Sequence, residues 1–172
     1  MADVFRRRCG RLAVSVMKMS HIDEKGNARM VDVSSKEATS RRAIASGSIK
    51  LGRNASAAID DDEVPKGDVF STARIGAISA VKRTWESIPL CHPLRIGGVE
   101  IEFNKDGNTI CATCTVKGVE STGFEMEALT GVTTALLIIY DMTKALDRGM
   151  EIGEVRLIRK SGGKSGEYKW QG

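Results

Sequence analysis

The sequence predicts an α+β fold in which two main helices pack on one antiparallel sheet. Three observations support this prediction: a turn signal at residues 106–108 between two alternating stretches, a long apolar helix pattern at residues 121–148, and an order of strand, helix, strand, strand, helix, strand. With 172 residues, the chain can bury a core without disulfides or metals. We therefore expect a single domain over residues 21–172, preceded by a poorly ordered basic leader at residues 1–20.

The first third of the chain carries three predicted elements. After a turn at Lys25-Gly26-Asn27, the alternating residues 28–33 predict a short strand. Residues 41–51, rich in small and β-branched side chains, predict a longer strand. Residues 54–59 favour a short helix before an acidic loop.

A second helix is predicted from Asp68, a good N-cap, to about Trp85. Small residues at helical spacing give this helix a face for close packing. Two prolines, Pro89 and Pro93, prevent its continuation and make the loop between them rigid.

The second half of the chain gives the clearest signals. Residues 99–103 and 109–117 alternate on either side of Asp106-Gly107-Asn108, which predicts a β-hairpin. After the long helix, residues 154–159 predict a last strand. This order of elements is that of the ferredoxin-like fold.

The long helix carries the strongest functional signal. Residues 135–140 are apolar on every side, so we expect protein to cover the helix all round. Asp141 and Lys144 follow at positions i and i+3 and share one face, which indicates a site, although such a pair is most often only a solvated ion pair. Glu127 lies on the same stripe, about 21 Å from Asp141 in an unbroken helix. Either the ligand is long, or the ends serve different sites, or another subunit completes each site.

Composition limits the class of partner. Of a formal net charge of +4, the first 16 residues supply +3, which leaves little basic charge in the body for a nucleic-acid partner. An RNA-binding sheet would also need stacking aromatics, and the predicted strands carry little beyond Phe103. The longest apolar run, six residues, is too short for a membrane span. Four cysteines indicate a reducing compartment, hence the cytoplasm, unless the leader targets an organelle.

Two loops carry lysines that could bind an anion. Lys66 precedes the helix N-terminus at Asp68, where an anion site or a general acid or base is favoured, although Lys-Gly-Asp is also a commonplace loop. Lys160 and Lys164 flank glycines that expose amides for a phosphate, with a flexible tail as the alternative. His92, between the prolines, could donate to a phosphate or is simply structural.

Cys111 and Cys114 have the spacing of a zinc or redox pair. They lie within a predicted strand, where positions i and i+3 point to opposite faces. We therefore predict no metal site here.

Six stretches in this order resemble the cyclic pyranopterin monophosphate synthase family of molybdenum cofactor biosynthesis: KGDVFSTARI, KRTW, IPLCHPL, TGFEMEALT, IYDMTKALD and KSGGKSG. The resemblance implies a homohexamer, a trimer of dimers, with sites at subunit boundaries. It also implies a lyase that converts (8S)-3′,8-cyclo-7,8-dihydroguanosine 5′-triphosphate to cyclic pyranopterin monophosphate and diphosphate. No cofactor is required by the sequence, and Mg²⁺ accompanying the diphosphate stays open. A nucleotide-sensing or assembly subunit without chemistry is the alternative.

The resemblance also implies roles for individual residues. The catalytic residues that carry over are Asp141, Lys144 and Lys66. The residues that carry over as substrate-binding are Leu90, Cys91, His92, Glu125, Met126, Glu127 and Lys160. We add Lys164 as a phosphate ligand beside Lys160 and His92. The chain departs from the family pattern at Phe124, where Val is commoner, and at Thr143, where Cys is common.

Overall fold

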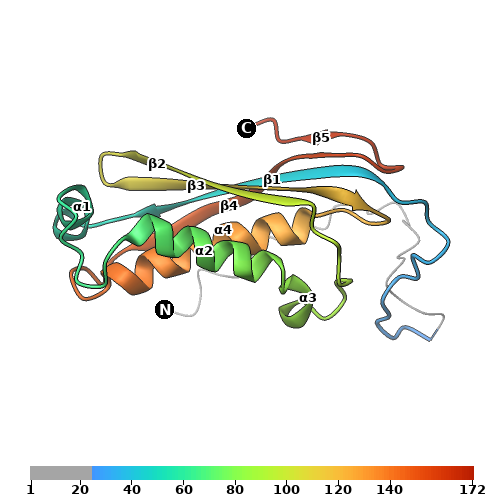
Figure 1. The fold of residues 1–172 in the computed structure, drawn as a ribbon, viewed down its shortest axis with the longest axis horizontal. Helices are drawn as coiled ribbons and strands as arrows, with labels where there is room; N and C mark the ends of the chain where they lie inside the picture. Colours follow the sequence, from blue (N-terminus) through green and yellow to red (C-terminus); the bar gives the residue numbers. More distant parts are fainter. Residues whose placement is uncertain (1–24) are drawn as a thin grey trace, which may run out of the picture. The chain divides into compact units, whose positions relative to one another are not determined.

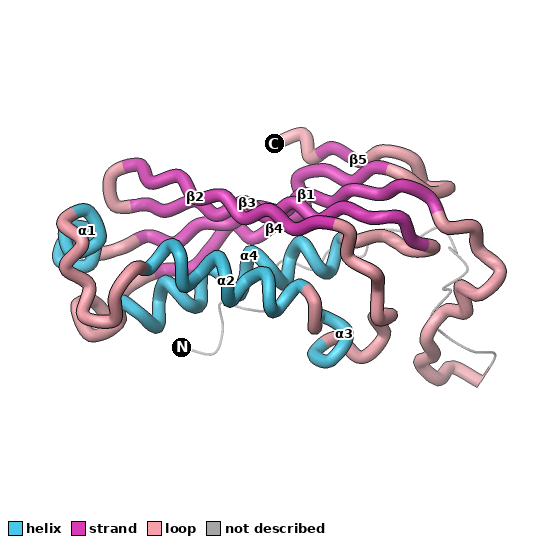
Figure 2. The backbone as a smooth tube through the Cα atoms, in the orientation of Figure 1, coloured by secondary structure: helices cyan, strands magenta, loops and turns pink. Residues whose placement is uncertain are grey.

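The structure, a computed structural model, describes residues 25–172. The predicted leader and His21 lie outside these residues. The chain divides into two compact units, one ending at Val31 and the other comprising Asp32–Gly172. All helices and strands of the described residues belong to the second unit (Figures 1 and 2).

The second unit is built on one antiparallel sheet with the strand order β2-β3-β1-β4-β5. Its strands are β1 (Thr39–Lys50), β2 (Gly98–Asp106), β3 (Thr109–Glu120), β4 (Glu151–Ser161) and β5 (Tyr168–Lys169). The long strand β1 lies between β3 and β4 and pairs with both in antiparallel register. Strands β2 and β3 form the predicted hairpin. The first four strands therefore have the order of the predicted ferredoxin-like fold, and β5 extends the sheet at one edge.

The described helices are α1 (Arg53–Asp60), α2 (Val69–Val81), α3 (Thr84–Ser87) and α4 (Glu125–Thr143). Helices α2 and α4 lie side by side on one face of the sheet (Figure 1). The predicted N-cap of α2 is confirmed, because the Asp68 carboxylate accepts the Ser71 backbone N–H at 3.0 Å.

The extents predicted for two helices and one predicted strand were wrong. The helix after Asp68 does not continue to Trp85: α2 ends at Val81 and α3 is separate, because Arg83 has φ −121°, outside the helical region. The long helix is shorter at both ends than residues 121–148. In place of a strand at residues 28–33 there is an isolated bridge at Ala28. The Asp32 carboxylate then accepts the Ser34 N–H at 2.9 Å, a local hydrogen bond that favours a turn over a strand.

Small residues let the helices approach the sheet closely. A Cβ added to Gly47 in β1 would lie 2.9 Å from Val132 and 3.0 Å from Leu136, both on α4. A Cβ on Gly131 would likewise lie 2.6 Å from the Cys114 sulfur in β3. Helix α4 is therefore seated directly on the central strands, which fixes the position of both of its ends.

The apolar stretch of α4 is not covered all round within one chain, contrary to expectation. Leu137 is 54% exposed, and Ile75 on the neighbouring helix α2 is 71% exposed. Large exposed apolar side chains on adjacent helices mark an interaction surface. The sequence pattern therefore indicates a burial that one chain does not supply.

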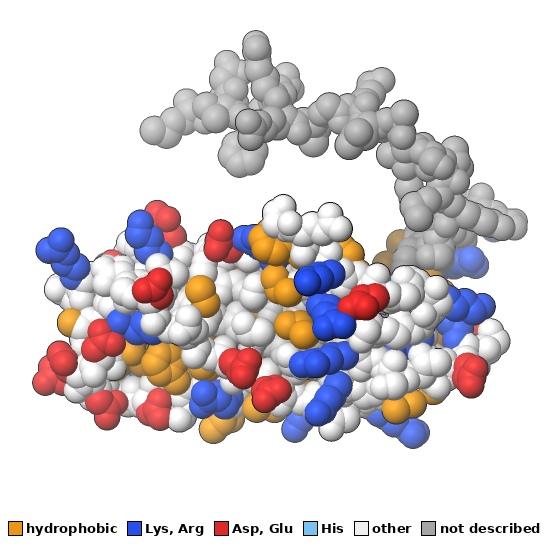
Figure 3. Space-filling view, turned by 90° about the horizontal axis from the view of Figure 1, so that it is seen from above, with side chains coloured by type: hydrophobic (Ala, Val, Ile, Leu, Met, Phe, Trp, Pro, Cys, Tyr) orange, Lys and Arg blue, Asp and Glu red, His pale blue; other side chains and the backbone are white. Residues whose placement is uncertain are grey.

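The sheet face opposite the helices is basic in part. Arg42 is exposed beside the buried Ala43 and pairs with Lys117, so both side chains lie on this outer face. By the same register, Arg156 and Arg159 of β4 also lie on it, and Lys and Arg side chains form a band across the face (Figure 3). Phe103 points to the helix side, where its ring lies 5.2 Å from that of Phe70, and is not available there for stacking a base.

No helix among residues 25–172 is long and apolar enough to cross a membrane.

Candidate active site

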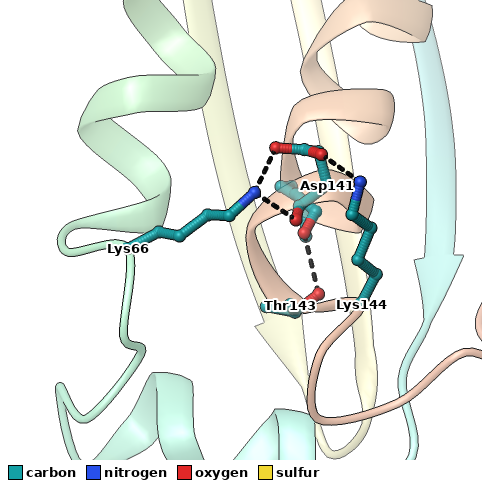
Figure 4. Close-up of polar contacts among 5 residues, drawn as sticks. Lys66, Asp141, Thr143 and Lys144 are labelled. Carbon is teal, nitrogen blue, oxygen red and sulfur yellow. Dashed lines mark hydrogen bonds and ion pairs between the residues drawn. The ribbon is translucent and has the colours of Figure 1, made fainter.

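The three residues predicted to be catalytic meet in the structure. Lys66 comes from the loop before α2, whereas Asp141 and Lys144 lie at the C-terminal end of α4 (Figure 4). The Lys66 Nζ donates to the Asp141 Oδ2 at 2.6 Å and to the Asp141 backbone carbonyl at 3.0 Å. The Lys144 Nζ lies 2.7 Å from Asp141 Oδ1, on the other side of the carboxylate.

The backbone around Lys66 explains its position. Gly67 has φ +87°, a conformation that favours glycine, and its N–H donates to the Val64 carbonyl at 2.9 Å. Asp68 then caps α2, so the turn and the cap together direct the Lys66 side chain towards α4. The sequence Lys-Gly-Asp thereby provides a lysine on a short, well-defined loop.

Two ammonium groups control the charge of the carboxylate between them. Hydrogen bonds from Lys144 and then from Lys66 lower the pKa of Asp141 to about 2. The side chains of Lys66, Asp141 and Lys144 are 48%, 53% and 53% exposed, so within one chain solvent reaches all three. At neutral pH the cluster is an anion held between two cations.

The cluster borders an open, mainly apolar hollow of about 570 Å³. Its lining residues come from the loop before α2 and from the facing surfaces of α2 and α4: Lys66, Thr72, Ile75, Gly76, Ile138, Asp141 and Met142. A group bound in this hollow would contact both the exposed Ile75 and the Asp141 carboxylate.

A second group of predicted residues lies around the first turn of α4. Glu127 is only 3% exposed, and burial raises its pKa to about 7. Burial and the nearby Glu127 also raise the pKa of the Cys91 thiol. Leu90 and Met126 are each 38% exposed, and His92 is half-buried. This end of the helix therefore carries a carboxyl group that can gain or lose a proton near neutral pH.

The glycine-rich loop after β4 borders a larger cavity, of about 970 Å³, beside the same end of α4. Glu125, Lys160 and Lys164 line it, and the Lys160 Nζ lies 3.6 Å from the Glu125 Oε1. Gly162 and Gly163 have φ of +95° and +73°, so the loop needs glycine at both positions. The glycines therefore shape the predicted phosphate loop beside a cavity whose walls carry more cationic than acidic side chains.

Arg41 is a cavity residue that the sequence did not reveal. Its Nε and Nη2 donate to the carbonyls of Glu120 and Ser121 at 2.7 Å and 3.1 Å, which holds the guanidinium in the wall of the larger cavity. The only available signal was the pair Arg41-Arg42 at the start of a predicted strand, where one of the two must face inward.

The predicted residues form two clusters within one chain. The hollow at the Lys66–Asp141–Lys144 cluster shares no lining residue with the cavity at the glycine-rich loop. Glu127 and Asp141 are 14 residues apart in one continuous helix, or about 21 Å along its axis. No small ligand could contact both clusters of the same chain.

The predicted geometry of the two neighbouring cysteines is confirmed. Cys111 is exposed, whereas Cys114 is fully buried and burial raises its pKa to about 12. Their thiols point to opposite faces of β3. Within residues 25–172, no three His, Cys, Asp or Glu side chains gather in a way that could hold a metal ion.

Comparison with known proteins gives a consistent result. The model of the MoaC family matches residues 30–163. The chain is 50% identical to a cyclic pyranopterin monophosphate synthase of Parvibaculum lavamentivorans over 91% of this chain and 99% of the relative. It is 50% identical to one of Clostridium perfringens (89% and 98% covered) and 49% identical to one of Streptomyces griseus (88% and 86% covered). The chain therefore belongs to the MoaC family.

Proposed function

We propose that this chain is a lyase of molybdenum cofactor biosynthesis with the activity for which its relatives are named. It converts (8S)-3′,8-cyclo-7,8-dihydroguanosine 5′-triphosphate to cyclic pyranopterin monophosphate and diphosphate. The observation that carries the proposal is the Lys66–Asp141–Lys144 cluster, in which a carboxylate bridges two ammonium groups. It occurs in a chain half identical to synthases over nearly its whole length.

The charges of Asp141, Lys66 and Lys144 give these residues different roles in proton transfer. A carboxylate with a pKa of about 2 is a weak general base near neutral pH, so Asp141 orients the two lysines. Lys66 and Lys144 then carry protons as the five-membered ring of the purine opens and the pterin forms. Glu127, with a pKa of about 7, can serve as a further proton carrier.

The glycine-rich loop is assigned to the phosphates. Lys160 and Lys164 neutralise phosphate oxygens, and His92 and the loop amides donate hydrogen bonds to them. A ribose-derived hydroxyl attacks the α-phosphorus, a new P–O bond forms, and diphosphate leaves with the electrons of the bond that breaks. Leu90, Cys91, Glu125 and Met126 complete the walls that hold the bicyclic ring system.

The separation of the two clusters supports assembly. We assign a homohexamer, a trimer of dimers, in which the cluster at Asp141 of one chain faces the loop lysines of another. The exposed Ile75 and Leu137 give the apolar surface that such an assembly would bury. The proposed site of action is the cytoplasm. No resident cofactor is assigned, and turnover with and without a chelator tests for Mg²⁺ beside the diphosphate.

The direct experiment supplies the cyclised nucleotide and follows diphosphate release. The wild-type chain is expected to turn over, whereas Asp141→Asn and Lys144→Ala are expected to fall by at least about 100-fold. A wild-type chain that binds the nucleotide and assembles without releasing diphosphate would instead identify a subunit without chemistry. Full turnover by both variants would exclude the two residues from catalysis.

A further inference from the structure

After the glycine-rich loop, a short segment, residues 167–170, returns along the sheet edge beside β4 (Figure 1). We call this segment the C-terminal strap. Its strand β5 contains two residues, which pair with Arg159 and Lys160, and the Trp170 N–H donates to the Ile158 carbonyl at 2.9 Å. So few backbone hydrogen bonds do not hold a strand firmly.

Two side-chain contacts on the outer face of the sheet reinforce the strap. The Arg159 Nη2 lies 2.6 Å from the Glu167 Oε1. The guanidinium of Arg156 lies over the Trp170 ring, 4.4 Å from the ring centroid. The Arg156 Nη2 also lies 3.2 Å from the Glu154 Oε1. Both contacts join the strap to β4.

The strap and the proposed phosphate loop are mechanically linked. Residues 162–166 connect β4 to the strap, so the position of the strap fixes where this loop ends. Lys160 pairs with the inward-facing Ala43 and lies on the helix side of the sheet, whereas its neighbour Arg159 lies on the outer face. The Lys160 Nζ contacts the Ser165 hydroxyl, and Lys164 and Ser165 border the large cavity.

We propose that the C-terminal strap positions the glycine-rich loop for the triphosphate, with Glu167 and Trp170 as positioning residues. Neither side chain touches the substrate. Each raises the fraction of chains in which Lys164 and the loop amides line the cavity, and the apparent affinity for the triphosphate is proportional to that fraction. The inference rests on the proposed function, since it assigns the triphosphate to this loop.

The test first reverses the charge of Glu167 and then reverses the charges of both Glu167 and Arg159. Glu167→Arg places two arginines together and releases the strap, and Glu167→Arg/Arg159→Glu restores the ion pair in the opposite sense. Trp170→Leu removes the second contact. Glu151→Gln, an exposed glutamate at the other end of β4, is the matched control. All are exposed or half-buried positions, so the core is not disturbed.

Two quantities are measured in the full chain. Calorimetry gives the dissociation constant of inorganic triphosphate, and kinetics gives the KM of the cyclised nucleotide. For Glu167→Arg and Trp170→Leu both should rise about fivefold while kcat stays near wild type, and the double swap should recover. Unchanged affinity in both single variants, or no recovery in the swap, would overturn the proposal. The calorimetric readout does not need turnover, so a chain that binds triphosphate but releases no diphosphate would refute the proposed function alone.

Discussion

Lys66 and Asp141 are 75 positions apart in the sequence, yet the Lys66 ammonium contacts both the side chain and the backbone carbonyl of Asp141. The backbone contact is informative because a carbonyl near the C-terminal end of a helix carries partial negative charge. Lys66 is therefore drawn to the end of α4 as well as to one carboxylate. Lys144 completes the pair of cations from the last turn of the same helix.

Removing either cation should raise the pKa of Asp141. In Lys144→Met it should move from about 2 towards 3.8, and in Lys66→Met by a smaller step, because the Lys144 hydrogen bond is the largest cause of the shift. Carbon-detected NMR titration of the Asp141 carboxyl measures this directly. Lys105→Met, which removes an ion pair with Asp60, is the control and should leave Asp141 unchanged.

The low pKa of Asp141 also makes the stability of the fold depend on pH. The folded-state pKa of Asp141 lies below its ordinary value of 3.8, so the ionised cluster stabilises the fold above about pH 4 and this stabilisation is lost as the pH falls towards 2. A titration in which both methionine variants still give about 2 would show that the lysines are not the cause.

Glu127 should have the opposite effect on stability. Its folded-state pKa of about 7 exceeds the ordinary 4.5, so between these values the folded chain keeps a proton that the unfolded chain has released. The free energy of unfolding should therefore fall as the pH rises through this window, by about 3 kcal/mol in all. Glu127→Gln should remove this dependence, and urea unfolding at fixed protein concentration from pH 4.5 to 8 measures it.

The exposed Glu151→Gln serves as the control and should keep the wild-type slope. Parallel curves for the wild type and Glu127→Gln would mean that Glu127 is not desolvated in solution.

Features set by neighbouring residues were predictable from the sequence. The hairpin at Asp106-Gly107-Asn108 and the Asp68 cap each depend on a few adjacent residues, and both are confirmed. The ion pair of Asp141 and Lys144 followed from their i, i+3 spacing on a helix. Local chemistry therefore identified the fold class and two of the three residues of the Lys66–Asp141–Lys144 cluster.

Features set by distant contacts were not predictable. Strand β5 is too short to show alternation, and it exists because β4 offers it an edge. Arg41 lines the large cavity because it binds the carbonyls of Glu120 and Ser121, 79 and 80 positions away. The raised pKa of Glu127 depends on which side chains cover it, and a sequence pattern does not specify that covering.

Thr143 offers a prediction on the departure from the family pattern. Thr143 stands between Asp141 and Lys144 in the sequence, and its buried hydroxyl donates to the Ile139 carbonyl at 2.7 Å and lies 3.1 Å from the Met150 sulfur (Figure 4). Thr143→Ala should destabilise the chain by about 1–2 kcal/mol through the cavity it leaves. Thr143→Cys, the residue that the family resemblance favours here, fills that space and should lose less than half as much stability in thermal unfolding. An equal loss of stability in both variants would show that the side-chain volume at position 143 does not determine the stability.

The last prediction concerns the two clusters that lie about 21 Å apart along α4. If each site combines the Asp141 cluster of one chain with the loop of another, two inactive variants should rescue each other. Asp141→Asn and Lys160→Ala, co-expressed with different tags and purified as mixed oligomers, should recover roughly a quarter of wild-type diphosphate release, because random pairing unites two intact halves that often. A mixture of Asp141→Asn with Lys144→Ala carries both defects in the same half and should stay inactive. Recovery in neither mixture would place each complete site within a single chain, and recovery in both would point to exchange of wild-type protein.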